Sequence, residues 1–422
     1  MIKRIKRAFY FPIANYFKFW ASIQLKLWKP RIIVVTGSSG KTTLLHLIQS
    51  QLGEKAKYSH YANSSYGIPF DILGLSRKNL TPDEWPALFL LAPFKAFKPV
   101  PNEKLYIVEA DCDRSGEGKF LAEFLNPDIT LWINSGLTHS ANFDRLVKEK
   151  KFPCVEEGIA YEFGFFPQHT KTLVIVNGNS ELIRKQLGKT TAIIKKVSIE
   201  SLREYRIFNN RTEFITEDKK YSINFIVPKD VFYSIRMTDL LMKSLDLPFD
   251  ATFKNLNLPP GRNSIFKGIK NTTIIDSTYN ATPQGVGNIL EMFGKYPSAN
   301  KWLVLGDMTE LGEKEKEEHE KLAAFINSMD LSKIILIGPR ISINTFHKLN
   351  SKSVEKTVKF IMPKEGLDYI SKNIKGKEAL LFKGARFLEG IVENLLQNKT
   401  DADKLVRREI AWRIRRKAWG LQ

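Results

Sequence analysis

The stretch RIIVVTGSSGKTT, from Arg31 to Thr43, decides the fold of this chain. Ile32 to Val35 is a short apolar, β-branched run, which is typical of a buried parallel strand. A small, glycine-containing loop follows, and an amphipathic run begins at Lys41. The order of strand, glycine loop and helix predicts a phosphate-binding loop, because glycines let backbone N–H groups approach phosphate oxygens and the helix N-terminus adds its positive dipole end.

In such a loop Lys41 reaches the β- and γ-phosphates of a nucleotide, and the Thr42 hydroxyl binds Mg²⁺. The full spacing G-x-x-x-x-G-K-[ST] is not met, because position 35 is valine and the shorter T-G-S-S-G-K-T-T stands here. The alternative is a glycine turn that only joins a strand to a helix, but Lys-Thr-Thr at the helix start favours the phosphate loop. The residues predicted to hold the nucleotide are Gly37, Ser38, Ser39, Gly40, Lys41, Thr42 and Thr43.

Length and composition indicate an ordinary globular protein of two or three domains. The chain has 422 residues, 43% of them apolar, which is enough to bury real cores. Its two cysteines, Cys112 and Cys154, argue against a disulfide framework and favour a reducing cytoplasm.

The net charge of +20 is concentrated at the two ends of the chain. Residues 1–31 carry eight Lys/Arg and no acid, and residues 399–422 carry eight Lys/Arg against three acids, so the ends hold 13 of the 20 net charges. This distribution predicts an anionic surface as a partner of the ends. Nucleic acid is the competing partner, but no RNA- or DNA-binding motif accompanies the charges, so none is expected.

The first 30 residues form a basic, aromatic segment. A signal peptide is not indicated, because Pro12, Asn15 and Lys18 interrupt the apolar run. A membrane span is excluded by the lack of a sufficiently long uncharged run. The pattern favours an interfacial helix on an anionic membrane, with a helix packed on the protein's own body as the alternative. The rings expected at the membrane are Phe9, Phe11, Phe17, Trp20 and Trp28.

Residues 399–422 are expected to form a basic amphipathic tail with Leu405, Ile410, Trp412 and Trp419, suited to the same surface. A solvated, partly disordered tail is the alternative.

The body of the chain alternates strands and helices, which predicts the α/β class with parallel sheets. Strands are expected near 105–108, 129–133 and 173–176, and again near 272–276, 301–307, 333–339 and 379–385. Short alternating stretches between 190 and 250 indicate an antiparallel sheet. We therefore expect a phosphate-loop central domain (31–259) and a C-terminal Rossmann-like, doubly wound domain (260–398).

Several polar groups follow the predicted strands, where α/β sheets bind ligands. Glu109 and Asp111 end the second strand, and Asn134 and His139 follow the third. A surface or capping role is the alternative for His139.

These strings together resemble the Mur ligase family. The carrying segments are TGSSGKTT, ANSSYGIP (62–69), IVEAD (107–111), NPDITLWINSGLTH (126–139), PGR (260–262), IIDSTYNATP (274–283), VLGDMTELG (304–312) and LLFKGARFLEGIV (380–392). The resemblance covers about residues 31–397. Within the family it is nearest to the MurF type, which adds D-alanyl-D-alanine to a UDP-muramoyl tripeptide.

The resemblance implies an ATP-dependent ligase that forms an amide bond through an acyl phosphate, from a carboxylate acceptor and an amino-acid or dipeptide donor. It implies that Thr42 and Glu109 bind one Mg²⁺, and His139 a second. Lys41, Glu109, His139 and Arg262 are the expected catalytic residues. The nucleoside would be held by Asn134, Arg262, Asp276, Tyr279 and Asn280, and the substrates by Asn63, Ser64, Asp307 and Lys383. For Asp307, a helix cap is an equal alternative, and for Tyr279 a core position is the alternative.

The chain departs from the family pattern in three places. The family carries a UDP-binding domain before the phosphate loop, whereas 30 basic, aromatic residues stand here, which opens the alternative of a lipid-linked acceptor. Phe163 stands where the family has a carbamylated lysine near the second metal, and Glu162 is a candidate to supply the missing charge. Asp111 and Ala385 replace a usual glycine and serine.

We expect a monomeric cytoplasmic enzyme, peripheral on the inner face of the cell membrane. The alternatives are a related ligase with another acceptor, and a nucleotide-binding, membrane-associated protein without ligase chemistry.

Overall fold

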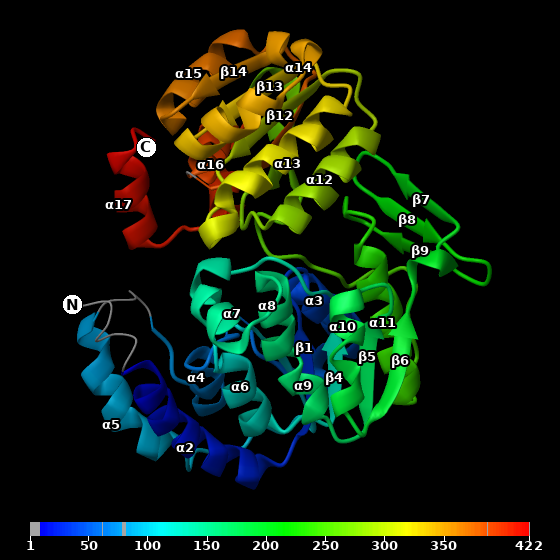
Figure 1. Cartoon of the computed structure of the whole chain (residues 1–422), viewed down its shortest axis with the longest axis vertical. Helices are drawn as coiled ribbons and strands as arrows, with labels where there is room; N and C mark the ends of the chain where they lie inside the picture. The colour runs from blue at the N-terminus through cyan, green and yellow to red at the C-terminus, as the bar shows by residue number, and fades with distance from the viewer. Residues whose placement is uncertain (1–8, 61, 78–81, 386, 422) are drawn as a thin grey trace. The chain divides into compact units, whose positions relative to one another are not determined.

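The computed structural model describes the whole chain except residues 1–8, 61, 78–81, 386 and 422 (Figure 1). The basic start of the N-terminal segment therefore lies outside the described residues. The chain forms two compact units, Met1–Glu200 with Val231–Asp250, and Ser201–Asp230 with Ala251–Gln422. This division differs from the boundary expected at 259/260, because residues 201–230 and 251–259 group with the second unit.

The first unit is built on a six-stranded sheet in the order β2-β3-β1-β4-β5-β6, with every neighbouring pair parallel. The strands are β1 (Arg31–Thr36), β2 (Ala56–Tyr58), β3 (Leu105–Ala110), β4 (Ile129–Trp132), β5 (Leu173–Asn177) and β6 (Ile193–Val197). In β1 the last residue, Thr36, pairs with Ala110 of β3 and with Trp132 of β4. The loops that leave these three strands consequently start side by side at one edge of the sheet.

Helices pack on this sheet through apolar side chains that are buried against its strands. Leu44 and Ile48 of α3 (Lys41–Leu52) and Met237 and Leu241 of α11 (Val231–Ser244) belong to one buried cluster with the strands. Contacts also join α6 (Glu117–Leu125), α8 (Val155–Phe163) and α9 (Phe165–Gln168). Helices α4 (Gly67–Leu73), α5 (Trp85–Lys95), α7 (Asp144–Lys150) and α10 (Glu181–Arg184) also belong to this unit.

The second unit holds a six-stranded sheet in the order β10-β11-β15-β12-β13-β14, parallel except for the β10–β11 pair. Its strands are β10 (Ser264–Gly268), β11 (Thr272–Ser277), β12 (Lys301–Gly306), β13 (Lys333–Ile337), β14 (Thr357–Phe360) and β15 (Ala379–Lys383). Helices α12 (Pro283–Lys295), α13 (Glu315–Asn327), α14 (Ser351–Glu355), α15 (Pro363–Asn373) and α16 (Leu388–Leu395) accompany this sheet. The α/β class with two sheets is thus confirmed.

A small antiparallel sheet also belongs to the second unit. It consists of β7 (Glu204–Ile207), β8 (Thr212–Ile215) and β9 (Lys220–Ile223). The antiparallel sheet expected between 190 and 250 is therefore present, but it begins only at β7. The stretch at 193–197, which is β6, instead extends the parallel sheet of the first unit.

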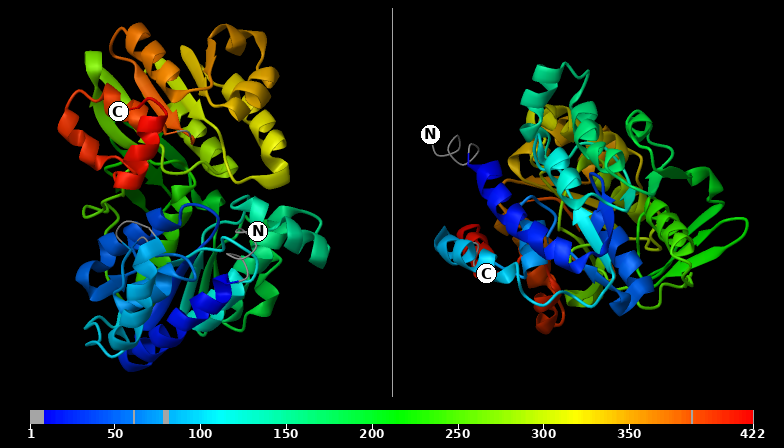
Figure 2. Two further views of the ribbon diagram at one scale, coloured as in Figure 1. Left: turned by 90° about the vertical axis from the view of Figure 1, so that its left-hand side faces the viewer. Right: turned by 90° about the horizontal axis from the view of Figure 1, so that it is seen from below.

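The N-terminal segment packs on the first unit as helix α2 (Tyr10–Trp28), beside α4 and α5 (Figures 1 and 2). Phe17 and Trp28 are buried, and Trp28 donates a hydrogen bond to the Glu103 carbonyl at 2.7 Å. The expectation that these two rings face a membrane is wrong, because they fill the unit's own core; Phe9 and Phe19 remain exposed. None of the helices in the described part of the chain combines the length and apolar character needed to cross a bilayer.

The C-terminal tail also folds onto its own unit. Helix α17 (Ile410–Ala418) is preceded by the buried Leu405, and the buried Arg416 pairs with Glu389 of α16. The rings of Trp412 and Trp419 lie 6.1 and 5.9 Å from that of Phe387. The tail is therefore an ordered helix, and the alternative of a solvated, disordered tail is wrong for residues 410–418.

Two phenylalanines of α2 provide a matched test of its packing. Phe17→Ala removes a fully buried ring, and we expect it to lower the free energy of unfolding by about 3–5 kcal/mol. Phe19→Ala removes a ring that is 60% exposed and should change stability by less than about 0.5 kcal/mol. Urea unfolding of the full chain measures both values. Equal values for the two variants would contradict the packing of α2.

Candidate active site

The phosphate loop joins β1 to α3 in a conformation that requires glycine. Gly37 has φ +137°, and a Cβ there would lie 2.8 Å from Ile133 Cγ2 and 2.9 Å from the Asn134 carbonyl oxygen. Gly40 has φ +78° and directly precedes α3. A side chain at either position would be strained, so the loop keeps its backbone close to the residues that follow β4.

Lys41 is buried in this loop and points back into it. Its Nζ donates to the Gly37 carbonyl oxygen at 2.6 Å and pairs with Asp111 Oδ2 at 2.7 Å. Burial by itself favours the neutral amine, but the charges of Asp111 and Glu109 outweigh this and raise the pKa of Lys41. The predicted phosphate-binding lysine is therefore held charged by an acid that follows β3.

Thr42 and Glu109 meet as the sequence predicts. The Thr42 hydroxyl donates to Glu109 Oε2 at 2.8 Å, and the Asn63 amide lies 3.5 Å from Glu109 Oε1. A hydroxyl and a carboxylate at this distance form an oxygen pair of the kind that Mg²⁺ prefers. The pair arises because β1 and β3 are parallel neighbours whose ends lie together.

Asn134 fixes the shape of the phosphate loop. Its Oδ1 accepts from the Ser39 amide at 3.0 Å, and its Nδ2 donates to Ser39 Oγ at 2.8 Å. The Ser38 hydroxyl donates to the Gly136 carbonyl at 2.9 Å. Asn134 thus lies at the loop, as expected, while its contact with a nucleoside stays a prediction.

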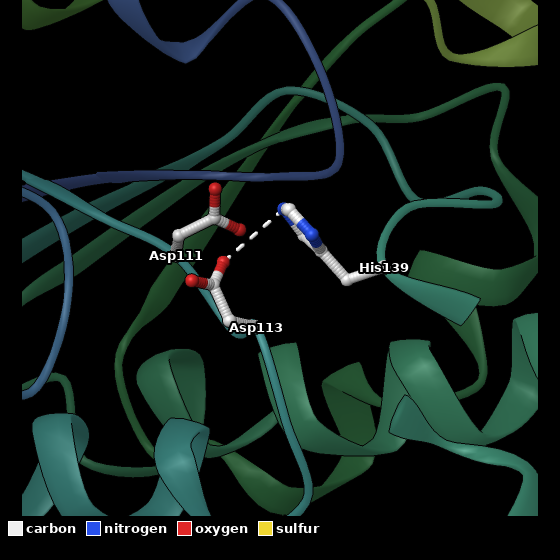
Figure 3. Close-up of side chains that lie close together, drawn as sticks. All are labelled: Asp111, Asp113 and His139. Atoms are coloured by element: carbon white, nitrogen blue, oxygen red, sulfur yellow. Dashed lines mark ion pairs between the residues drawn. The ribbon is translucent and has the colours of Figure 1, made fainter. Parts of the chain in front are cut away.

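Asp111, Asp113 and His139 converge at one point of the first unit (Figure 3), and Asp111 also pairs with Lys41. His139 Nε2 lies 3.2 Å from Asp113 Oδ1, and ligand atoms of Asp111, Asp113 and His139 all lie within 4.8 Å of one another. Burial and the nearby charge of Asp111 raise the pKa of Asp113 to about 6. Such a set of two carboxylates and an imidazole can hold a divalent cation.

Asp113 is a functional candidate that the sequence reasoning missed. The signal is present in the string EADCD, where Glu109, Asp111 and Asp113 alternate after the apolar strand. Alternate residues share a side when a chain is extended. Glu109 and Asp111 were singled out for their place at the end of the strand, and Asp113 was not.

Glu162 was a candidate for the negative charge that a carbamylated lysine supplies in the family. The structure does not place its carboxylate in that role. Its Oε1 accepts from the Gly116 amide at 2.8 Å and its Oε2 from the Gly118 amide at 3.1 Å. The carboxylate therefore caps the start of α6, where backbone amides need acceptors. Phe163 is fully buried, with its ring 6.3 Å from that of Trp132, so it is a core residue.

The loop at 62–67, which carries the predicted substrate residues, is tied to the rest of the unit by Glu117, a residue that the sequence did not single out. Glu117 Oε1 accepts from the Ser65 amide at 2.9 Å and from the Tyr10 hydroxyl at 2.7 Å. The predicted substrate residue Ser64 accepts from the Gly67 amide at 3.2 Å at the start of α4. Helix α2 thus supports the loop that carries Asn63 and Ser64.

In the second unit, Asp276 and Tyr279 lie where β11 ends. Asp276 is fully buried, and its Oδ1 accepts from the Thr278 amide at 3.0 Å and hydroxyl at 2.7 Å. The Arg262 guanidinium lies 4.0 Å from the centre of the Tyr279 ring. The Tyr279 ring is 47% exposed, so the core alternative for this residue is wrong. Asn280 is exposed next to it.

Lys383 and Asp307 are both buried in the second unit. Lys383 Nζ lies 3.4 Å from Ser277 Oγ. Asp307 Oδ1 accepts from the amides of Arg340 and Ile341 at 3.1 and 3.0 Å, at the start of the short helix η8 (Ile341–Thr345). A substrate role and a helix cap were both open for Asp307, and the structure shows a cap. The capped helix is η8, which is not the helix that follows Asp307 in sequence.

The geometry of the first unit defines an α/β protein with a phosphate loop and a carboxylate-rich edge. Residues 35–237 match the model of the Mur ligase middle domain, and residues 261–386 match that of the Mur ligase glutamate ligase domain. Together these cover most of the chain, and the chain belongs to the Mur ligase family. Ligases of this type are ATP-dependent enzymes that form amide bonds.

Individual relatives agree with this assignment. The UDP-N-acetylmuramoyl-tripeptide–D-alanyl-D-alanine ligase of Buchnera aphidicola is 24% identical over 394 residues, 88% of this chain and 78% of the relative. The same ligase of Bacillus subtilis is 22% identical over 389 residues, 87% of this chain and 76% of the relative. Thus the chain aligns with most of the length of both enzymes.

Solved structures share the fold. MurF ligase from Thermotoga maritima, in complex with ADP, has a TM-score of 0.72 at 21% identity and covers 90% of this chain and 82% of that one. MurF from Acinetobacter baumannii has a TM-score of 0.71 at 18% identity, with 90% and 80% covered.

Lys383 gives a pH dependence that can be tested. Burial, with the charge of Arg262 added, lowers the pKa of Lys383 from 10.5 to about 8. Between these two values the unfolded chain binds more protons at this residue than the folded chain, so stability rises with pH. We expect wild type to gain stability relative to Lys383→Met between pH 7 and pH 10. Urea unfolding at the two pH values measures this difference.

The matched control is Lys372→Met, which removes an exposed lysine of α15. Its stability relative to wild type should stay constant between the two pH values. A constant difference for Lys383→Met as well would show that this amine is not held in an environment that disfavours its charge.

Proposed function

We propose that this protein is a MurF-like ligase that joins a carboxylate acceptor of the peptidoglycan-precursor class to an amino-acid or dipeptide donor. In the proposed reaction an acceptor carboxylate oxygen attacks the γ-phosphorus of ATP, ADP leaves, and an acyl phosphate forms. The donor amine then attacks the acyl carbon, phosphate leaves, and the amine loses a proton as the amide forms. The observation that carries the proposal is the phosphate loop with Lys41 beside the carboxylates that end β3.

The residues of the first unit suit this chemistry by position and charge. Lys41 and the loop amides would bind the β- and γ-phosphates, with Asn134 holding the loop in shape. Asn63 and Ser64 would face the acceptor. Phosphoryl transfer asks the protein mainly to position groups and neutralise charge, which is what a buried lysine and a row of backbone amides provide.

Two positions fit Mg²⁺, which supplies charge neutralisation on phosphate oxygens when bound. Thr42 and Glu109 would hold one ion, since their oxygens lie 2.8 Å apart. Asp111, Asp113 and His139 would hold a second, since their ligand atoms lie within 4.8 Å of one another. This second set needs no carbamylated lysine, because Asp113 supplies a carboxylate within the cluster.

We assign the nucleoside to the residues where β11 ends. Arg262, Tyr279 and Asn280 offer a guanidinium, a half-exposed ring and an amide there. Lys383 would serve the substrates from the same unit. Residues 31–259 and 260–398 would act as the central and C-terminal domains of the ligase.

We place the protein in the cytoplasm as a monomer, at the inner face of the cell membrane through its two basic ends. In α17, Ile410 and Ile414 are exposed among Arg413, Arg415 and Lys417. Apolar and basic side chains on one short helix suit the headgroup region of an anionic membrane.

Replacing Lys41 tests the nucleotide site. Lys41→Ala removes the cation for the β- and γ-phosphates, and we expect it to weaken binding of Mg²⁺·ATP by roughly 100-fold or more. Isothermal calorimetry measures the affinity, and Lys171→Ala, at a lysine that is 45% exposed, is the control. Equal affinity in wild type and Lys41→Ala would rule out the phosphate-loop assignment.

Replacing Asp113 tests the second metal position. We expect Asp113→Asn to weaken Mn²⁺ binding by roughly tenfold or more, because a charged ligand is lost. Electron paramagnetic resonance of bound Mn²⁺ measures this without any need for turnover. Glu181→Gln, at an exposed acid of α10, should leave Mn²⁺ binding unchanged. Ligase activity that rises on addition of bicarbonate would contradict a site without a carbamylated lysine.

A further inference from the structure

The outer face of α5 is apolar along its whole length. Leu90, Phe94 and Phe97 are 72%, 77% and 67% exposed, and Leu91 and Val100 are also exposed. Leu90, Leu91 and Phe94 lie on one face of the helix, and Phe97 and Val100 follow in the segment after it. Within the helix, only Leu88 and Ala92 are buried. Single exposed apolar residues need no explanation, but a contiguous row of large ones marks an interaction surface.

Helix α2 lies beside this row. The Tyr16 hydroxyl donates to the Phe89 carbonyl at 2.7 Å, and the Phe17 and Phe89 rings lie 5.0 Å apart. Figure 1 shows α5 at the edge of the first unit next to α2. The outward side of α2 carries Phe19, 60% exposed, and Lys26 one heptad further on the same face. We call the exposed residues of these two neighbouring helices the α2–α5 face.

The charged residues within α2 and α5 are all lysines, although Asp83 and Glu84 directly precede α5. The segments 10–29 and 85–102 contain Lys18, Lys26, Lys29, Lys95 and Lys98 and no acidic residue. Lys26 and Lys29 are exposed, Lys95 is half-buried at the end of α5, and Lys18 lies over the Phe120 ring. A second copy docking through the same face would bring lysines against lysines, which is unfavourable. An anionic surface with an apolar interior is complementary to both features.

We propose that the α2–α5 face is a docking surface for an anionic lipid bilayer. The rings of Phe94, Phe97 and Phe19, with Leu90, enter the boundary between headgroups and acyl chains, and the lysines pair with lipid phosphates. This surface extends the proposed membrane location to residues of α5 and does not depend on ligase chemistry. It also gives α2 two roles, since its inner side fills the core while its outer side faces lipid.

Vesicle sedimentation of the full chain tests this surface. The probe is vesicles of phosphatidylglycerol and phosphatidylcholine, compared with phosphatidylcholine alone, at low and high salt. We expect binding to the anionic vesicles that weakens with salt. The double variant Leu90→Asp/Phe94→Asp should lower partitioning by roughly tenfold or more, because the two side chains that insert become charged. Both positions are exposed, so the fold should persist, with unchanged Mg²⁺·ATP affinity as its check.

The matched control is Ile343→Asp/Ile361→Asp, which places the same two charges at exposed apolar positions of the second unit, 65% and 51% exposed. It should sediment with vesicles as wild type does. A second measurement uses Phe94→Trp, whose fluorescence should be quenched by lipids brominated on the acyl chain.

Three results would overturn the proposal. The wild-type chain could stay in the supernatant with anionic vesicles at low salt. The α5 double variant could bind as well as wild type, which would leave α17 as the anchor. Analytical ultracentrifugation could show a dimer that the α5 double variant converts to a monomer, which would make a second copy the occupant of the face.

Discussion

The ion pair between Lys41 and Asp111 holds the active-site edge of the first unit together. Both side chains are buried, and each has further partners: Lys41 Nζ donates to the Gly37 carbonyl, and Asp111 Oδ1 accepts from the Cys112 amide. The Asp111 amide in turn donates to the Asn63 carbonyl at 2.8 Å. The residues of this pair therefore connect the phosphate loop, the end of β3 and the loop that carries Asn63. Removing either partner would leave a buried charge uncompensated, which is the costly case for such pairs.

This pair also constrains how the site binds an anion. Here Asp111, at a position where the family resemblance implies glycine, already pairs with the lysine. The charge balance of nucleotide binding must therefore include Asp111. Asp113 and His139 place a second carboxylate and an imidazole beside Asp111.

The parts predicted from sequence are those fixed by local pattern. The run at 32–35, the glycines and the helix after Lys41 are all signalled within a dozen residues, and the structure has β1 and α3 there. The strand β6, IIKKV, was not foreseen, because its place at the edge of the parallel sheet depends on pairing with β5. The role of Glu162 was likewise hidden, since it is set by the Gly116 and Gly118 amides, more than 40 residues earlier in the chain. Long-range pairing of this kind leaves no local signal.

The two ends of the chain also could not be interpreted from local sequence alone. Aromatic and basic residues in a short helix suit both a membrane and the protein's own surface, so composition alone leaves α2 ambiguous. Burial of Phe17 and Trp28 decides the inner side. At the other end, Arg407 donates to the Thr278 and Tyr279 carbonyls at 3.1 and 2.9 Å and lies 3.4 Å from Glu389. Arg407 therefore contributes to the positive charge of the tail and also stabilises the loop after β11 through these hydrogen bonds. In both ends, aromatic or basic residues that suggested a membrane surface also form contacts within the protein's own unit.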